Sequence, residues 1–197
     1  MVCGLPACPL LEGAKAAFNA HGKVNDMEIR LQSLLQGRTR QTIQDADLRQ
    51  AAVLLPLFTL HGAYHVLFIK RSRTVEHHKG EISFPGGICE ASDSALEGTA
   101  LRETHEEIGI RPEDVRVLGL LDDMRTQSTR YRVTPVVGII PYPYPFVLSR
   151  REVEKIITVP LACLLEAGTG GKEEVIREGK VYCGLVYRYG SHVIWGA

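Results

Sequence analysis

The stretch FPGGICEASDSALEGTALRETHEEIGI, residues 84–110, places a Pro-Gly-Gly sequence shortly before a cluster of glutamates. Glu103, Glu106 and Glu107 fall within five positions of one segment that has helical apolar spacing. On a helix that advances about 100° per residue, the three carboxylates occupy a sector of about 100°. A neighbouring apolar stripe can pack on a sheet. The stretch therefore predicts an amphipathic helix with an acidic face, from about residue 92 to residue 108.

The clustered acids need a physical reason, because carboxylates three or four residues apart on a helix repel each other by about a few tenths of a kcal/mol per pair. A solvated acidic face is the ordinary alternative. Two features favour a cation site instead: the acids are not paired with lysines four residues further on, and a Gly-Gly sequence precedes the helix by a short interval. Hard cations such as Mg²⁺ bind carboxylates together with water and substrate phosphates. Arg102 is placed to brace one of the carboxylates.

The overall composition is that of an ordinary globular chain without a global charge. Its 197 residues suit one domain with a short appendage, and its 23 basic residues balance 23 acidic ones. No overall field therefore attracts nucleic acid or a membrane, so recognition of a charged ligand must be local. No apolar run approaches the ~20 residues that cross a bilayer. The five cysteines are scattered without zinc-finger spacing, which favours reduced thiols in a cytoplasmic protein.

Short β-like runs and a few helical segments alternate along the rest of the chain. Residues 27–36 and 160–166 predict two further helices, and Gly109 is placed to end the acidic helix. The predicted strands are 51–58, 64–71, 80–84, 115–121, 131–140, 154–159, 174–178, 180–189 and 192–197. Because helices and strands interleave without a regular βαβ rhythm, we expect a mixed-sheet α/β sandwich.

The predicted domain organisation is simple. Residues 1–26 form an N-terminal extension of unknown role that contains one short helix, at residues 10–20. Residues 27–197 form a single domain.

The glycines and acids together resemble the Nudix box, whose family pattern is G-x5-E-x7-R-E-U-x-E-E-x-G-U, with U a bulky apolar residue. The second half matches at Arg102, Glu103, Glu106, Glu107, Gly109 and Ile110. Thr104 stands where a bulky apolar residue is usual. In the first half, Ile88 and Ser94 stand where the pattern has Gly and Glu, and Gly87 lies one residue early.

The lengthened spacing resembles that of one branch of the family, the coenzyme A diphosphatases, which read roughly F-P-G-G-x-x-D-x-x-D before A-L-R-E-x-x-E-E. Glu90 and Asp93 occupy the two acidic places. Upstream, RSRTVEHHKGEISFPGG, residues 71–87, agrees in register with the branch, although Glu76 stands where many members have arginine. Downstream, YRVTPVVGII is similar to a further stretch of the branch. The resemblance extends over most of residues 50–197. Branch members commonly continue with a helix, which predicts an exposed apolar edge near Ile194 and Trp195.

The resemblance implies a Nudix α/β/α sandwich with a mixed β-sheet, and Mg²⁺- or Mn²⁺-dependent hydrolysis of a diphosphate. It implies that Glu103 and Glu107 bind metal, that Glu106 is a third metal ligand or the base, and that Arg102 belongs to the catalytic group. The residues expected to bind substrate are Arg71, His78, Lys79, Gly86 and Gly87. Of these, Arg71 and Lys79 are candidates for a ligand phosphate, and the two glycines are expected to form a tight turn. Glu152 or Glu154 is a candidate remote ligand, with plain surface charge as the favoured alternative.

The leading hypothesis is a hydrolase that splits coenzyme A, or an acyl derivative, into 3′,5′-ADP and the corresponding phosphopantetheine. One rival keeps the chemistry but acts on nucleoside triphosphates, oxidised nucleotides or ADP-ribose. A second rival is a catalytically silent module that binds a nucleotide or a protein, and such a module would be expected to lose box carboxylates that all remain here. The expected partner is a small molecule, not nucleic acid or a membrane, and the sequence allows a homodimer.

Overall fold

The computed structural model describes residues 25–75, 78–126, 130–167, 172–177 and 180–195. The helix expected at residues 10–20 lies outside them, and only the last two residues of the expected extension are described. No helix in the described part of the chain is long and apolar enough to cross a membrane.

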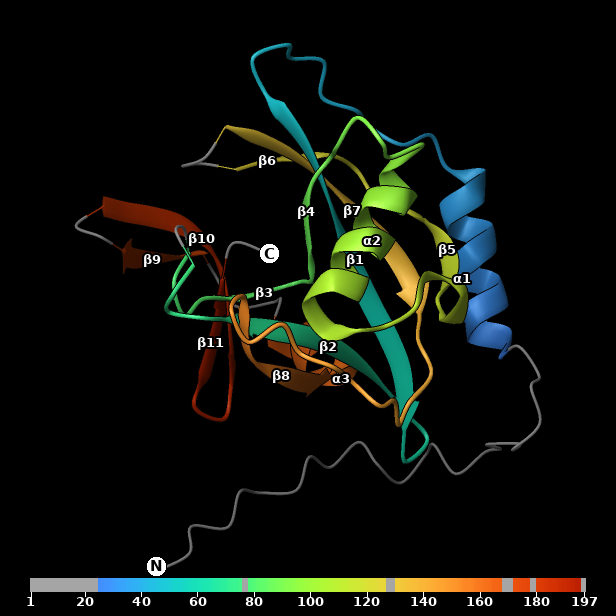
Figure 1. Cartoon of the computed structure of the whole chain (residues 1–197). Coiled ribbons are helices and arrows are strands. Elements are labelled where there is room, and N and C mark those ends of the chain that lie inside the picture. The colour runs from blue at the N-terminus through green and yellow to red at the C-terminus, as the bar shows by residue number, and fades with distance from the viewer. Residues whose placement is uncertain (1–24, 76–77, 127–129, 168–171, 178–179, 196–197) are drawn as a thin grey trace, which may run out of the picture.

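A mixed β-sheet forms the centre of the described structure (Figure 1). Its strands are β1 (Arg49–Leu60), β2 (Ala63–Arg71), β3 (Ile82–Ser83), β4 (Gly86–Ile88), β5 (Arg116–Leu120), β6 (Met124–Arg125), β7 (Tyr131–Ile139) and β8 (Val153–Pro160). The order is β3-β2-β1-β7-β5, with β4 beside β1, β6 beside β7 and β8 beside β2. β1 runs parallel to β7 and antiparallel to β2 and β4. The long apolar run of β1 fits this central place, because it is covered on both faces.

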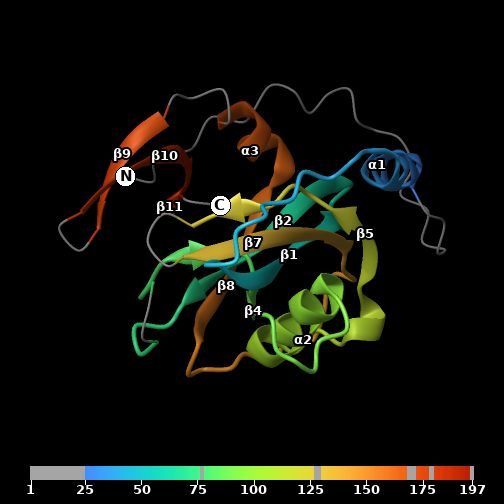
Figure 2. The same ribbon diagram turned by 90° about the horizontal axis from the view of Figure 1, so that it is seen from above.

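Helices cover both faces of the sheet, as Figure 2 shows. Helix α2 (Leu96–Ile108) lies on one face, and α1 (Asp26–Gly37) and α3 (Leu161–Ala167) lie on the other. The core on the α2 face includes Leu67 and Ile69 of β2, whereas the core on the other face includes Val66 and Phe68. This alternation is what a strand buried on both faces requires. The predicted α/β/α sandwich is confirmed.

A second, antiparallel sheet lies beside the first and consists of β9 (Lys172–Arg177), β10 (Lys180–Tyr189) and β11 (His192–Trp195). Ile194 on β11 is 1% exposed and belongs to the core on the α1 and α3 face. The expected exposed apolar edge is therefore wrong at this residue, because β11 packs against β3 and turns Ile194 inward.

The predicted elements differ from the structure chiefly near the Gly-Gly sequence and at β6. Helix α2 begins at Leu96 rather than at about residue 92, because Ala95 is extended, with φ −160° and ψ 167°. The strand expected at 80–84 is reduced to the two residues of β3, and the two-residue β6 was not predicted. β3 directly precedes β4, which pairs with β1, whereas β6 pairs with β7.

Candidate active site

Helix α2 carries the three glutamates at different depths. Glu107 is 1% exposed, whereas the side chains of Glu103 and Glu106 are 18% and 55% exposed. The helix ends at Gly109, whose φ of 76° is readily adopted by glycine and whose N–H donates to His105 O. Glu103 and Glu107 lie one helical turn apart and both face strand β4.

The two glycines of β4 contact the carboxylates of Glu107, which is buried, and of Glu103, which is partly buried. The Gly86 N–H donates a hydrogen bond of 2.9 Å to Glu107 Oε2. A Cβ on Gly87 would lie 2.4 Å from Glu103 Cδ and 2.5 Å from each of its carboxylate oxygens. Only glycine therefore leaves room for the Glu103 carboxylate against the backbone of β4.

The prediction that these glycines form a tight turn is wrong. Gly86 and Gly87 are strand residues, paired with Val53 and Ala52 of β1. A Cβ on Gly86 would lie 2.4 Å from Ala52 O, and Gly86 has a φ of 149° that other residues rarely adopt. The missing side chains thus allow a close approach of strand to strand and of strand to carboxylate.

Arg71, the last residue of β2, brings positive charge to Glu107. Its Nη1 lies 3.6 Å from Glu107 Oε1, and its side chain is 25% exposed. Its Nε is buried and has no hydrogen-bond partner within the described residues. The guanidinium of Arg71 therefore lies beside the acids and is partly exposed. Guanidinium donors suit phosphate oxygens.

Both buried carboxyl groups hold their protons more tightly than usual. Burial raises the pKa of Glu107 from 4.5 to about 8, although the Gly86 N–H and Arg71 act in the opposite direction. Burial also raises the pKa of Glu103 above its usual range, against the effect of Arg102. The Glu152 carboxylate adds to both increases. Burial is thus the main reason why these carboxyl groups resist ionisation, and the neighbouring carboxylates add to it.

Arg102 connects the helix to the loop that precedes it. Its Nε and Nη2 donate to the two oxygens of Asp93, each at 3.0 Å, and its Nη2 also donates to Ile88 O at 3.1 Å. Its Nη1 donates to Glu103 at 3.0 Å and to Glu106 at 3.4 Å. This fork of hydrogen bonds holds the pKa of Asp93 well below its usual range. The predicted brace is confirmed, and it holds more carboxylates than the one expected.

The donor set fits a divalent metal such as Mg²⁺. The ligands would be carboxylate oxygens, which hard cations prefer. The missing side chain at Gly87 leaves a space against β4 that the Glu103 carboxylate occupies, and we call this space the cradle. As arranged in the described residues, no three potential ligand side chains converge on one point. Arg102 lies between Glu103 and Glu106, so the exposed Glu106 must turn to join them.

The other predicted site residues lie apart from this cluster. His78 is exposed and its Nδ1 lies 2.9 Å from Glu81 Oε2, while Lys79 lies in the same loop. Of the two candidate remote ligands, Glu154 forms a 2.7 Å ion pair with Lys70. Glu152 is exposed and near enough to influence both buried acids, so it is the better candidate.

Sequence reasoning did not single out Lys70 and Arg73, which line a basic pocket together with Lys79. The signal that could have found them is the run KRSR at residues 70–73. Thr104, the departure from the family pattern, is fully buried and its hydroxyl donates to Ala100 O at 2.6 Å. A polar residue is tolerated there because its only donor is satisfied by the helix itself.

Sequence comparisons identify relatives along most of the chain. A family model of the NUDIX domain matches residues 48–167. The uncharacterized Nudix hydrolase NudL of Photorhabdus laumondii is 38% identical over 148 residues, which cover 75% of this chain and 78% of that protein. The protein of the same name from Cronobacter sakazakii is 36% identical over 159 residues, covering 81% of this chain and 82% of its own length.

Solved structures agree with the fold. A Nudix hydrolase from Alicyclobacillus acidocaldarius superposes with a TM-score of 0.51 at 21% identity, covering 64% of this chain and 86% of that one. RenU, a Nudix hydrolase from M. smegmatis, superposes with a TM-score of 0.50 at 24% identity, covering 60% and 74% of the two chains. Together with the match to the domain family, these likenesses show that the chain belongs to the Nudix hydrolases, enzymes that act on phosphorus-containing acid anhydrides.

Proposed function

We propose that this enzyme hydrolyses the diphosphate of coenzyme A, or of an acyl-coenzyme A, to 3′,5′-ADP and the corresponding phosphopantetheine. The observation that carries the proposal is the 3.6 Å approach of Arg71 to Glu107. Arg71 opens the upstream segment that resembles the coenzyme A branch, and Glu107 belongs to the Nudix box. Two segments that are separate in sequence thus contribute to one site.

The proposed roles follow from depth and charge. Glu103 and Glu107 would hold the metal, Mg²⁺ or Mn²⁺, and Glu152 would be an additional ligand. When bound, the metal supplies positive charge to the diphosphate oxygens and acidifies the attacking water. Glu106, with 55% of its side chain exposed, takes the proton from that water and passes it to solvent.

Arg71 and the β4 backbone orient the diphosphate. Arg71, whose side chain is 25% exposed, offers its guanidinium to a phosphoryl oxygen, and the absence of side chains at Gly86 and Gly87 lets the ligand approach the backbone. The oxygen of the attacking water bonds to phosphorus, and the bridging oxygen leaves with the other product. Arg102 acts by positioning, because its hydrogen bonds fix Glu103 relative to Asp93.

The test is product analysis with a substrate panel. The enzyme is incubated with Mg²⁺ and coenzyme A, an acyl-coenzyme A, ADP-ribose, NADH or 8-oxo-dGTP, and the products are separated by chromatography. The proposal predicts 3′,5′-ADP from coenzyme A as the preferred reaction. Glu107→Gln should remove activity while the protein stays folded. The matched control Glu113→Gln changes a glutamate with a 67% exposed side chain outside the site and should retain activity.

Two outcomes would overturn the proposal in different ways. Faster hydrolysis of ADP-ribose or of a nucleoside triphosphate would assign the same chemistry to another substrate. Absence of turnover on every substrate, with metal-dependent ligand binding retained, would identify a silent binding module. Unchanged turnover in Glu107→Gln would overturn the assignment of that carboxylate. The homodimer and the domain boundary at residue 27 stay predictions.

A further inference from the structure

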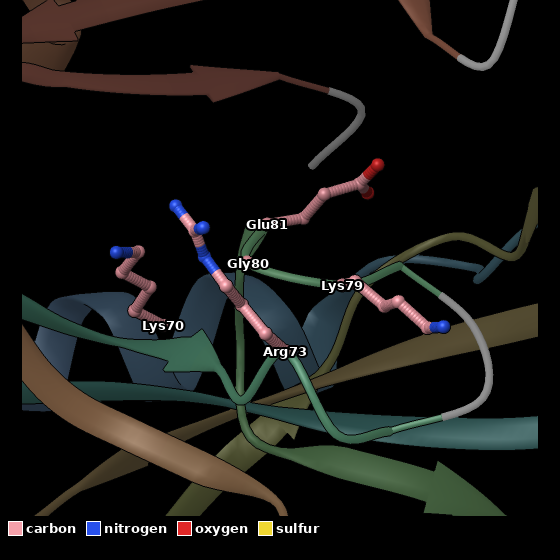
Figure 3. A pocket seen from close by; sticks show the side chains of 5 residues that line it. All are labelled: Lys70, Arg73, Lys79, Gly80 and Glu81. Atoms are coloured by element: carbon pink, nitrogen blue, oxygen red, sulfur yellow. The ribbon is translucent and has the colours of Figure 1, made fainter.

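A basic pocket lies outside the cluster of glutamates. It has a volume of about 330 Å³ and is lined by Lys70, Arg73, Lys79, Gly80 and Glu81 (Figure 3). The view in Figure 3 shows Lys70 and Arg73 directed toward the same side of the pocket, whereas the Lys79 ammonium extends away from them. Two cationic side chains therefore converge there, and a third stands at the rim.

This pocket belongs to the opposite face of the sheet from Glu107. Along β2, Phe68 packs in the core of the α1 and α3 face and Ile69 in the core of the α2 face. Because side chains alternate along a strand, Lys70 lies on the same face as Phe68. Arg71 lies on the other face, where it reaches Glu107. On the paired strand β8, Lys155 lies on the same face as Ile157, which also packs on the α1 and α3 side. The pocket is therefore distinct from the site of the buried glutamates.

Positive side chains gather on this face of the sheet, although their mutual repulsion does not favour the strand pairing. Lys70 and Lys155 are direct cross-strand partners, an arrangement of like charges that disfavours the pairing. Glu154 compensates Lys70 at 2.7 Å, and its pKa is lowered by Lys70 first and then also by Lys155 and Arg73. Several cations thus share one carboxylate. Burial lowers the pKa of the adjacent His192, and Lys155 and Lys70 lower it further.

The guanidinium of Arg73 is available for a ligand. Arg73 is exposed, and within the described residues it forms no ion pair or hydrogen bond. Among the residues that line the pocket, the carboxylate is that of Glu81, and it already interacts with His78 at 2.9 Å. An arginine fork beside a lysine is a pattern that binds the oxygens of a phosphate monoester.

We propose that the pocket formed by Lys70, Arg73 and the neighbouring Lys155 binds a phosphate monoester dianion, as a second anion site on the face of the sheet opposite to the glutamates. The guanidinium of Arg73 binds two phosphate oxygens, and the ammonium groups contribute charge. The site needs no metal and no turnover. The proposal does not depend on which diphosphate the glutamates hydrolyse.

Inorganic phosphate is the probe for the test, titrated into the metal-free full-length protein at constant ionic strength. Binding is followed by calorimetry and by the backbone amide resonances. We expect Arg73→Gln to weaken phosphate binding by about tenfold or more, because one charge-assisted contact is lost. The matched control Arg30→Gln removes the same charge from an exposed position on α1 and should leave binding unchanged. Lys79→Gln should weaken binding by less than about threefold, since its ammonium points away.

The resonance changes identify the location of binding. The proposal expects phosphate to shift the amides of Arg73, Gly80 and Lys155 and to leave those of the α2 glutamates in place. Equal phosphate affinity in Arg73→Gln and Arg30→Gln would overturn it. Shifts confined to α2 and β4 would also overturn it, because they would assign the phosphate to the catalytic face. Neither readout uses hydrolysis, so a failure here is distinct from a failure of the proposed reaction.

Discussion

Replacing Glu107 by glutamine should change how the stability of the metal-free enzyme depends on pH. The wild-type carboxyl is 1% exposed, and burial raises its pKa from 4.5 to about 8. Between these two values the folded protein holds a proton that the unfolded chain has already released. The free energy of unfolding therefore falls as the pH rises through this window. Glutamine has nearly the same shape, and its carbonyl oxygen can accept the Gly86 N–H in place of Oε2.

The size of the effect follows from the pKa difference. Each pH unit within the window corresponds to about 1.4 kcal/mol for one proton. From pH 6 to pH 9 the wild-type carboxyl crosses the upper part of the window, up to its pKa of about 8. The wild type should thus lose on the order of 3 kcal/mol relative to Glu107→Gln over this range. At pH 6 the folded wild-type group is protonated but the unfolded chain, with its usual pKa of 4.5, has already released the proton. The wild type should therefore already be less stable than Glu107→Gln by about 2 kcal/mol at pH 6.

Urea denaturation in EDTA at pH 6 and pH 9, followed by circular dichroism, measures this difference. The matched control is Glu106→Gln, which removes a carboxylate that is 55% exposed on the same helix and should follow the wild type. Mg²⁺ should stabilise the wild type more at pH 9 than at pH 6, because metal binding requires the deprotonated carboxylate. If the free energies of the wild type and Glu107→Gln change in parallel between the two pH values, the argument for a buried, protonated Glu107 fails.

Two further substitutions test the cradle and the brace. Gly87→Ala should weaken Mg²⁺ binding by about tenfold or more in calorimetry, because its Cβ would lie 2.4 Å from Glu103 Cδ. The control Gly98→Ala, in helix α2, meets its nearest atom at an ordinary 3.8 Å and should instead raise stability by about 0.5–1 kcal/mol with metal binding intact. Arg102→Lys should lower the free energy of unfolding by on the order of 2 kcal/mol in urea titrations, because lysine cannot replace the two-pronged contact with Asp93. A stability equal to that of the wild type would contradict this role of Arg102.

The fold was predictable because its signals are local and repeated. The apolar runs of β1 and β2 and the glycine that ends α2 at Gly109 are each visible in a short stretch of sequence, so the sandwich could be predicted from them. Strand β4 was not predictable in this way. Three residues with two glycines carry no alternation, and their strand character comes from pairing with β1, far away in the sequence.

The candidate site was predictable only in its composition. Helical spacing placed Glu103 and Glu107 on one face, but the burial of Glu107 depends on β4 and β2 closing over it. The basic pocket illustrates the same limit. Lys70 and Lys155 lie 85 positions apart, and only the register of β2 with β8 makes them neighbours. A single sequence gives the residue types, whereas the charge that they create together depends on strand pairing.

The departure from the strict family spacing has a physical explanation in Asp93. Its carboxylate accepts hydrogen bonds from Arg102, from the Thr99 hydroxyl at 2.8 Å and from the Glu90 N–H at 2.9 Å. One side chain thus joins the loop after β4, the first turn of α2 and the arginine that holds Glu103. With one extra residue between the glycines and the helix, an acid at this position ties the longer loop to the helix. The spacing therefore preserves the position of the glutamates against β4 and does not weaken the resemblance on which their assignment rests.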